Sequence, residues 1–181
     1  IGICQELHQR RWDTPWGANM RADKIDERVC ELAAKANCAE FWIGVESGSE
    51  VIQRHINKGI TVPSIRKSFA LARRYGIFRR AYVLLGSPPE RYATIKETEE
   101  LLDEIDPDMV GFSILAPYPG TPYFDSLVKE RLDINWEDVD EYSNRYWHSD
   151  HLTNEELRAE QARLLEKYKD CLLYTSDAAD E

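Results

Sequence analysis

Short apolar segments alternate with helical patterns along this chain, and this alternation constrains its fold more than any other feature. The apolar segments cover residues 16–21, 41–45, 79–85 and 109–115, and the helical patterns between them cover 26–36, 50–57, 64–75 and 94–105. Near-continuous apolar strands separated by helices are typical of a parallel sheet covered on both faces, or of a barrel. Because βα units wind right-handed, an open doubly wound sheet and a segment of a barrel both fit the pattern.

Local signals place the ends of two helices. Asp26 is a favourable N-cap for the first of them, because its side chain can accept a hydrogen bond from the first turn. Thr153 and Glu156 form a capping box, which predicts a C-terminal helix that runs to about residue 168. A further short helix is predicted at 123–131.

The composition favours one α/β domain and excludes some classes of function. The 181 residues suffice for one hydrophobic core, and no apolar run is long enough to cross a bilayer. The formal net charge of −10 argues against general nucleic-acid binding, but it says little about a small-molecule substrate. The cysteines show neither metal-site spacing nor a disulfide framework, which predicts free thiols in the cytoplasm: Cys4, Cys30, Cys38 and Cys171.

Glu46 and Ser47 end the second apolar segment and begin a strand-to-helix loop. In parallel α/β folds such loops lie at the carboxyl edge of the sheet, where ligands bind. A carboxylate beside a hydroxyl can accept both hydroxyls of a ribose, or can hold an ammonium group. The alternative is that Glu46 pairs with Arg21 or Arg79 and only ties strand ends together.

The other strand ends carry further candidates. Gly86 follows the strand at 79–85, where a missing Cβ lets the backbone approach a flat ligand, although an ordinary turn is equally consistent. Ser113 lies on the last predicted strand, and Pro117 begins a defined turn after that strand. Arg21 ends the first strand, and its guanidinium group is suited to hold a ligand carboxylate. An ion pair with Asp23 or Glu46 within the chain is an equally consistent role for Arg21.

Together, these strand ends resemble the radical S-adenosylmethionine superfamily, in the branch that often carries a cobalamin-binding domain. The motif Gly-Val-Glu-Ser-Gly-Ser at 44–49 is a frequent form of the family's fourth strand end, which contacts the ribose and methionine parts of S-adenosylmethionine. The fifth strand end of the family usually reads Gly-x-Pro-Gly-Glu, and here Pro89 replaces the second glycine. The resemblance implies six cofactor-binding residues and no metal ligand in this chain: Arg21, Glu46, Ser47, Gly86, Ser113 and Pro117.

The resemblance also implies the fold and the domain limits. It predicts an α/β fold, a partial TIM-like (β/α)6 barrel with its third to sixth strands and a C-terminal helical extension. The barrel part is expected at 1–130 and the extension, which ends in a helix, at 131–170. Residues 171–181 match the translation of a transposase-type sequencing adapter, so they are expected to be an artefactual tail.

The chain lacks the Cys-x3-Cys-x2-Cys triplet that binds the 4Fe-4S cluster of this superfamily. We therefore expect a C-terminal fragment of a larger enzyme, inactive alone, with the cluster ligands and any cobalamin domain upstream. The resemblance implies reductive cleavage of S-adenosylmethionine to begin radical chemistry on an unknown substrate, with cobalamin as a further cofactor and flavodoxin or ferredoxin as electron donor. Two other interpretations stay open: a non-radical TIM-like barrel enzyme with Glu46 as general base, and a non-catalytic βα module that binds a nucleotide-like ligand.

Overall fold

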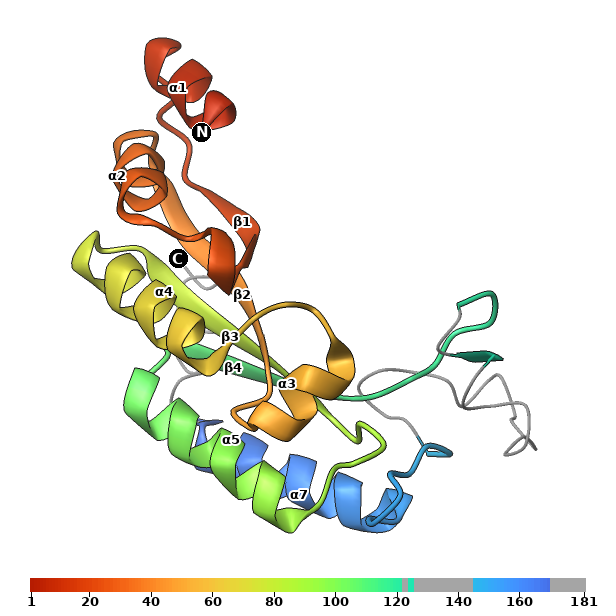
Figure 1. Ribbon diagram of the computed structural model, residues 1–181. Helices are drawn as coiled ribbons and strands as arrows, with labels where there is room; N and C mark the ends of the chain where they lie inside the picture. The colour runs from red at the N-terminus through yellow and green to blue at the C-terminus, as the bar shows by residue number, and fades with distance from the viewer. Residues whose placement is uncertain (122–123, 126–144, 170–181) are drawn as a thin grey trace, which may run out of the picture.

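A four-stranded parallel sheet organises the molecule (Figure 1). The computed structural model describes residues 1–121, 124–125 and 145–169. The strands are paired in chain order: β1 (Trp16–Arg21), β2 (Cys38–Glu46), β3 (Phe78–Leu85) and β4 (Met109–Ile114). A doubly wound sheet reverses its strand order at a switch point, whereas a barrel adds each strand beside the last. The sheet is therefore the segment of a TIM-like barrel that the resemblance predicted.

Helices follow one another along one side of this sheet (Figure 1). They are α2 (Glu27–Lys35), α4 (Val62–Arg74), α5 (Tyr92–Ile105) and α7 (Asn154–Lys167). Two short elements lie at strand ends: η1 (Ala22–Lys24) after β1 and α3 (Glu50–Ile56) after β2. Helix α1 (Gly2–Gln9) was not predicted, and it contacts α2.

The caps explain where the helices begin. The Asp26 side chain accepts a hydrogen bond from the Val29 N–H at 2.8 Å, and Thr153 and Glu156 form the predicted reciprocal box. Helix α4 begins at Val62, two residues before the predicted start, because Thr61 is its N-cap and a proline occupies its first turn.

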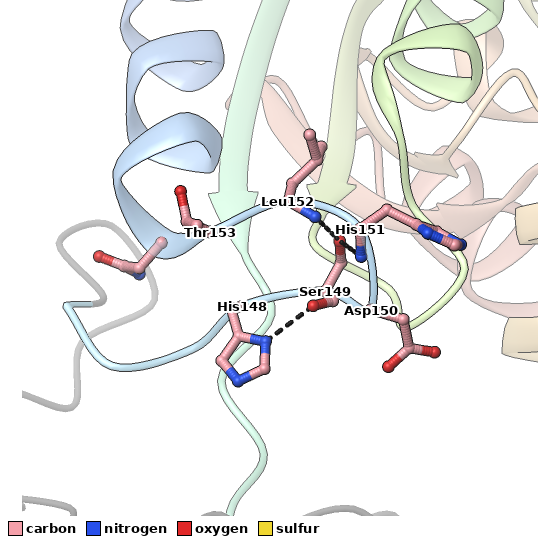
Figure 2. Close-up of a pocket in the computed structure, with 7 residues that line it drawn as sticks. His148, Ser149, Asp150, His151, Leu152 and Thr153 are labelled. Carbon is pink, nitrogen blue, oxygen red and sulfur yellow. Dashed lines mark hydrogen bonds between the residues drawn. The ribbon is translucent and has the colours of Figure 1, made fainter.

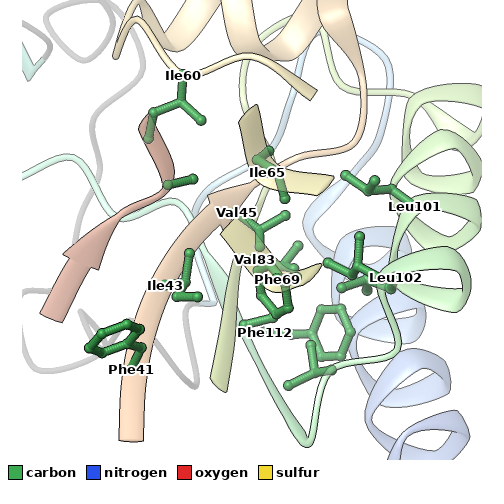
Figure 3. Packing of buried hydrophobic residues seen from close by; sticks show 14 of the residues in the cluster. Phe41, Ile43, Val45, Ile60, Ile65, Phe69, Val83, Leu101, Leu102 and Phe112 are labelled. Atoms are coloured by element: carbon green, nitrogen blue, oxygen red, sulfur yellow. The ribbon is translucent and has the colours of Figure 1, made fainter. Parts of the chain in front are cut away.

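The hydrophobic core lies between the strands and these helices (Figure 3). From Phe41 onward every second side chain of β2 is buried, as expected for a strand with one covered face. The same alternation continues in β3 and β4. Figure 3 shows members of this core from the strands, Phe41, Ile43, Val83 and Phe112, and from the helices, Ile65, Phe69, Leu101 and Leu102.

The opposite side of the sheet corresponds to the inside of the barrel, and we call it the inner face. Its side chains alternate with those of the core and are partly exposed or exposed. Residues of the inner face include Asn19, Arg21, Trp42, Gly44, Tyr82 and Ser113.

Further predictions of the sequence analysis differ from the structure or lie outside the described residues. Strand β2 begins at Cys38 rather than at 41, because backbone pairing with β1 extends through residues 38–40, where Glu40 interrupts the apolar run. The predicted helix at 123–131 falls largely outside the described residues, and the tail at 171–181 falls outside them entirely. The limits of the barrel part and of the extension therefore stay predictions.

Candidate functional site

The carboxyl ends of β1, β2 and β3 meet at one edge of the sheet. Arg21 ends β1, Glu46 ends β2 and Gly86 follows β3, and the parallel register keeps these ends side by side. The predicted site residues from these strands thus share the edge where βα barrels bind their ligands. Ser113 lies on the inner face of β4, and Pro117 is buried just beyond it.

Glu46 has an unusual backbone conformation. Its φ of 61° lies in the left-handed region, which non-glycine residues rarely adopt. The register shifts between Gly44 and Glu46, and the Ser47 N–H donates to the Val45 carbonyl at 2.8 Å across a tight turn. Such bulges redirect a side chain, and strained residues of this kind cluster at functional sites. The bulge turns the Glu46 carboxylate toward the inner face.

Lys58 is the partner of this carboxylate, and the sequence analysis did not identify it. Lys58 Nζ forms a short ion pair with Glu46 Oε1. Arg21 binds the Asp23 carboxylate at 3.0 Å and donates to the Lys58 carbonyl at 2.7 Å. The predicted alternative of a Glu46 pair with Arg21 or Arg79 is therefore wrong, since Arg79 binds Asp108 near the opposite edge.

Ser47 lies in the scaffold of the loop. Its side chain is buried, and its Oγ shares a hydrogen bond of 2.9 Å with Thr98 Oγ1 of α5. The Gly48 N–H donates to the same Thr98 oxygen at 2.9 Å. The Gln53 amide of α3 donates to the Val45 and Ser47 carbonyls. The loop that carries Glu46 is thus attached to both neighbouring helices, and a cofactor contact through Ser47 stays a prediction.

A buried carboxyl organises the loop between β3 and α5. Glu90 accepts hydrogen bonds from the Gly86 N–H at 3.2 Å and from the Thr94 hydroxyl at 2.6 Å. Burial raises the pKa of Glu90 to about 7, because the charged form loses its hydration, and these two hydrogen bonds only partly offset that effect. Gly86 itself has a φ of 88°, a conformation that favours glycine.

Residues 147–152, which we call the strap, dock onto this loop (Figure 2). Trp147 Nε1 donates to the Gly86 carbonyl at 2.6 Å, and Ser149 Oγ donates to the Glu90 carbonyl at 2.9 Å. A Cβ at Gly86 would lie only 3.1–3.3 Å from Leu157 and Trp147, so their side chains already occupy that side of Gly86. The strap also borders an open pocket of about 520 Å³, lined by residues 148–154.

A second pocket, of about 300 Å³, opens on the inner face below the Glu46–Lys58 pair. We call it the inner-face pocket, and its lining comes from β1, β2, β3 and the loop after α3: Asn19, Met20, Arg21, Trp42, Gly44, Glu46, Lys58 and Tyr82. Trp42 Nε1 is buried there without a hydrogen-bond partner in the described part of the chain.

The structure offers no metal centre in the residues that it describes. No group of three or more His, Cys, Asp or Glu side chains is placed there to hold an ion. Burial raises the pKa of the Cys30 and Cys38 thiols to about 11, which disfavours the thiolate form that binds metals. None of the helices in residues 1–121 and 145–169 is long and apolar enough to span a membrane.

Comparisons with known proteins agree with this architecture. No family model matches the chain. It is 28% identical over 138 residues to an uncharacterized methyltransferase of Pyrococcus horikoshii, covering 75% of this chain and 30% of the relative. It is also 28% identical over 129 residues to the anaerobic magnesium-protoporphyrin IX monomethyl ester cyclase of Rubrivivax gelatinosus, covering 70% of this chain and 23% of the relative. The chain therefore spans less than a third of the length of these relatives.

A solved structure shows the same fold. The radical S-adenosylmethionine methyltransferase TsrM of Kitasatospora setae, with cobalamin and a 4Fe-4S cluster bound, matches with a TM-score of 0.61 and 22% identity, over 67% of this chain and 26% of that one. The fold is a segment of a TIM-like barrel, a class of fold that binds ligands at the carboxyl edge of its strands. The chain thus has the fold of radical S-adenosylmethionine enzymes, including cobalamin-dependent ones such as OxsB, which it matches with a TM-score of 0.63 and 19% identity.

Proposed function

We propose that this chain is the C-terminal part of the barrel of a radical S-adenosylmethionine enzyme. The whole protein would cleave S-adenosylmethionine reductively and begin radical chemistry on a small molecule, with electrons from flavodoxin or ferredoxin in the cytoplasm. The observation that carries the proposal is Glu46, whose strained backbone places a carboxylate at the mouth of the inner-face pocket.

The residues at this edge fit S-adenosylmethionine. Glu46 can accept both ribose hydroxyls or hold the ammonium of the methionine part, as the resemblance implies. Lys58 and Arg21 lie beside it and suit a carboxylate, although each is paired within the chain. We propose that the adenine of S-adenosylmethionine lies against the loop at Gly86 and against Ser113 and Pro117 at the end of the next strand.

The described residues do not fit the ligand set of a 4Fe-4S cluster. Cys4, Cys30 and Cys38 are buried thiols that form no ligand group, and burial raises the pKa of Cys30 and Cys38 to about 11. We propose that another part of the protein supplies the cluster ligands, and likewise any cobalamin domain. In the whole protein the cluster would supply the electron for reductive cleavage, and cobalamin would supply methyl-transfer chemistry.

The role of this chain is then binding and orientation. The bulge and the bonds from Thr98 and Gln53 fix the loop that carries Glu46, which keeps the carboxylate preorganised. Alternating apolar side chains exclude water from the outer side of the strands. A general base at Glu46, as in a non-radical enzyme, would first have to leave Lys58.

The test of this proposal uses the full-length protein that contains this chain. Glu46→Gln keeps the shape of the side chain but removes its charge, so the affinity for S-adenosylmethionine should fall by about 1–3 kcal/mol, the range for a lost charged hydrogen-bond partner. Isothermal titration calorimetry measures this change. Production of 5′-deoxyadenosine by the reduced wild-type protein tests the reaction itself.

Glu50→Gln is the matched control, because Glu50 is exposed and lies outside the inner-face pocket. Its affinity should equal that of the wild type. Equal affinities for Glu46→Gln and wild type would show that Glu46 has only a structural role. A reduced wild-type protein that binds S-adenosylmethionine but forms no 5′-deoxyadenosine would overturn the radical function.

A further inference from the structure

Side chains hold both polar groups of Gly86. Its N–H donates to Glu90 Oε2 at 3.2 Å, and its carbonyl accepts a hydrogen bond from Trp147 Nε1 at 2.6 Å. The first bond lies within the loop between β3 and α5, whereas the second comes from the strap, 61 residues further along the chain. Glycine has the widest backbone freedom of any residue, so its orientation depends on such partners.

We propose that Trp147 is a positioning residue for the adenine of S-adenosylmethionine. Its indole N–H fixes Gly86 in the orientation that lets adenine lie against the loop, and it acts through Gly86 rather than by touching the ligand. The inference rests on the proposed function. It gives the strap, which follows the barrel strands in the sequence, a part in a site that the strand ends form.

The strap holds this loop at three carbonyl oxygens. Besides the Gly86 carbonyl, the Pro88 carbonyl accepts from the Asp150 N–H at 2.8 Å, and the Glu90 carbonyl accepts from Ser149 Oγ at 2.9 Å. The two consecutive prolines of the loop have no N–H, so the loop has few donors with which to hold itself. Its shape therefore depends on the donors that the strap supplies.

Packing keeps the indole of Trp147 in place. The side chain is only 2% exposed, and the Asn154 side chain donates to the Trp147 carbonyl at 2.7 Å. A Cβ at Gly86 would approach Trp147 Cδ1 to 3.2 Å and Leu157 Cδ1 to 3.1 Å. This side of Gly86 is therefore closed to a ligand, and adenine must approach the loop from the other side.

Fixing Gly86 in advance affects the affinity for the ligand. A flat ring that lies against backbone needs that backbone in one orientation. If the indole bond is lost, the glycine gains other orientations, and part of the binding free energy is then used to order it. The loss of the bond should thus weaken binding even where the fold is intact.

The experiment uses the full-length protein that contains this chain. Trp147→Phe keeps an aromatic ring but removes the N–H, so the affinity for S-adenosylmethionine should fall by about two- to tenfold, the equivalent of one ordinary hydrogen bond. Isothermal titration calorimetry measures this change. Hydrogen exchange of residues 84–90, followed by mass spectrometry without ligand, should become faster, because the loop has lost a partner.

A matched control is Trp16→Phe. Trp16 Nε1 also donates to a backbone carbonyl, that of Ala36, at 2.7 Å, but Trp16 is the first residue of β1 and lies away from the carboxyl ends of the strands. Trp16→Phe should lose stability in thermal unfolding and keep the affinity of the wild type. If Trp147→Phe does not fold, 3-benzothienylalanine at position 147 keeps a bicyclic ring without the N–H and should give the same loss of affinity.

The inference is overturned if a folded protein without the N–H at position 147 binds S-adenosylmethionine like the wild type, even where exchange of the loop is faster. It is also overturned if Trp16→Phe loses as much affinity as Trp147→Phe, since both bonds would then have only a structural role. Failure of the proposed function is seen separately, in a wild-type protein that does not bind S-adenosylmethionine or in a Glu46→Gln variant that binds it equally well.

Discussion

Glu90 shows how one residue can link two segments that are far apart in the sequence. Its carboxyl group is almost fully buried and binds the Gly86 N–H and the Thr94 hydroxyl, while its carbonyl accepts the Ser149 hydroxyl. Burial of an acid without a cation beside it favours the neutral form, which is why the pKa is raised to about 7 from 4.5.

The raised pKa of Glu90 predicts a pH-dependent stability. Between about pH 4.5 and 7 the unfolded chain has released this proton and the folded chain still holds it. The contribution of Glu90 to the free energy of unfolding is therefore fully present below pH 4.5. Above that pH it falls by up to about 1.4 kcal/mol for each pH unit, until the pH passes the pKa of Glu90 in the folded state. Glu90→Gln should remove this dependence, so the difference between wild-type and variant unfolding free energies, measured in urea, should change across this window. A constant difference would contradict the raised pKa.

Gly48 has a structural role that its place in the strand-end motif does not reveal. A Cβ at this position would lie 2.5 Å from the Glu97 carbonyl oxygen of α5, which is backbone and cannot move cheaply. Gly48→Ala should therefore destabilise the fold by about 1–3 kcal/mol, as overpacking does. Gly2→Ala is the control, since nothing lies within 4 Å of that Cβ, and it should not destabilise. Equal melting temperatures for Gly48→Ala and wild type would show that the loop can move away from α5.

At the scale of elements, the strap joins the β3–α5 loop to helix α7. Ser149 Oγ donates to the Glu90 carbonyl and accepts from the His151 and Leu152 N–H groups. Ser149→Ala leaves these buried groups without a partner and should cost about 1–3 kcal/mol of stability. Chemical denaturation measures the loss, and Glu155→Gln, at an exposed position of α7, is the control. If Ser149→Ala unfolds at the same denaturant concentration as this control, the strap does not stabilise the loop.

Periodicity and capping predicted most elements because these signals are local. The Asp26 cap and the box of Thr153 and Glu156 appear as expected, and β1 has the predicted bounds. The bulge at Glu46 and its pair with Lys58 were not predictable, since they depend on how β2 pairs with β3 and where the loop after α3 returns. The same holds for the strap, whose partners lie about sixty residues away in the sequence.

At the scale of the whole molecule, chain-order pairing of four parallel strands produces one covered face and one open face. The strand pattern alone left an open sheet and a barrel equally consistent, and only the family resemblance favoured the barrel. The partial exposure of Trp42 and Tyr82, beside fully buried neighbours in the same strands, marks the inner face. That distinction needs the structure, because both kinds of residue are apolar or aromatic in the sequence.

The described residues also predict how the 181-residue chain behaves when it is produced alone. A 4Fe-4S cluster needs thiolates in a fixed geometry, whereas burial raises the pKa of Cys30 and Cys38 to about 11 and keeps both thiols protonated. The isolated 181-residue chain should therefore bind no cluster and form no 5′-deoxyadenosine after anaerobic reconstitution with iron and sulfide. Absorbance of the cluster and chromatography of the nucleoside measure both, with the full-length protein as the positive control. Uptake of four irons with formation of 5′-deoxyadenosine by the chain alone would place the ligands within it and refute the assignment of the cluster to another part of the protein.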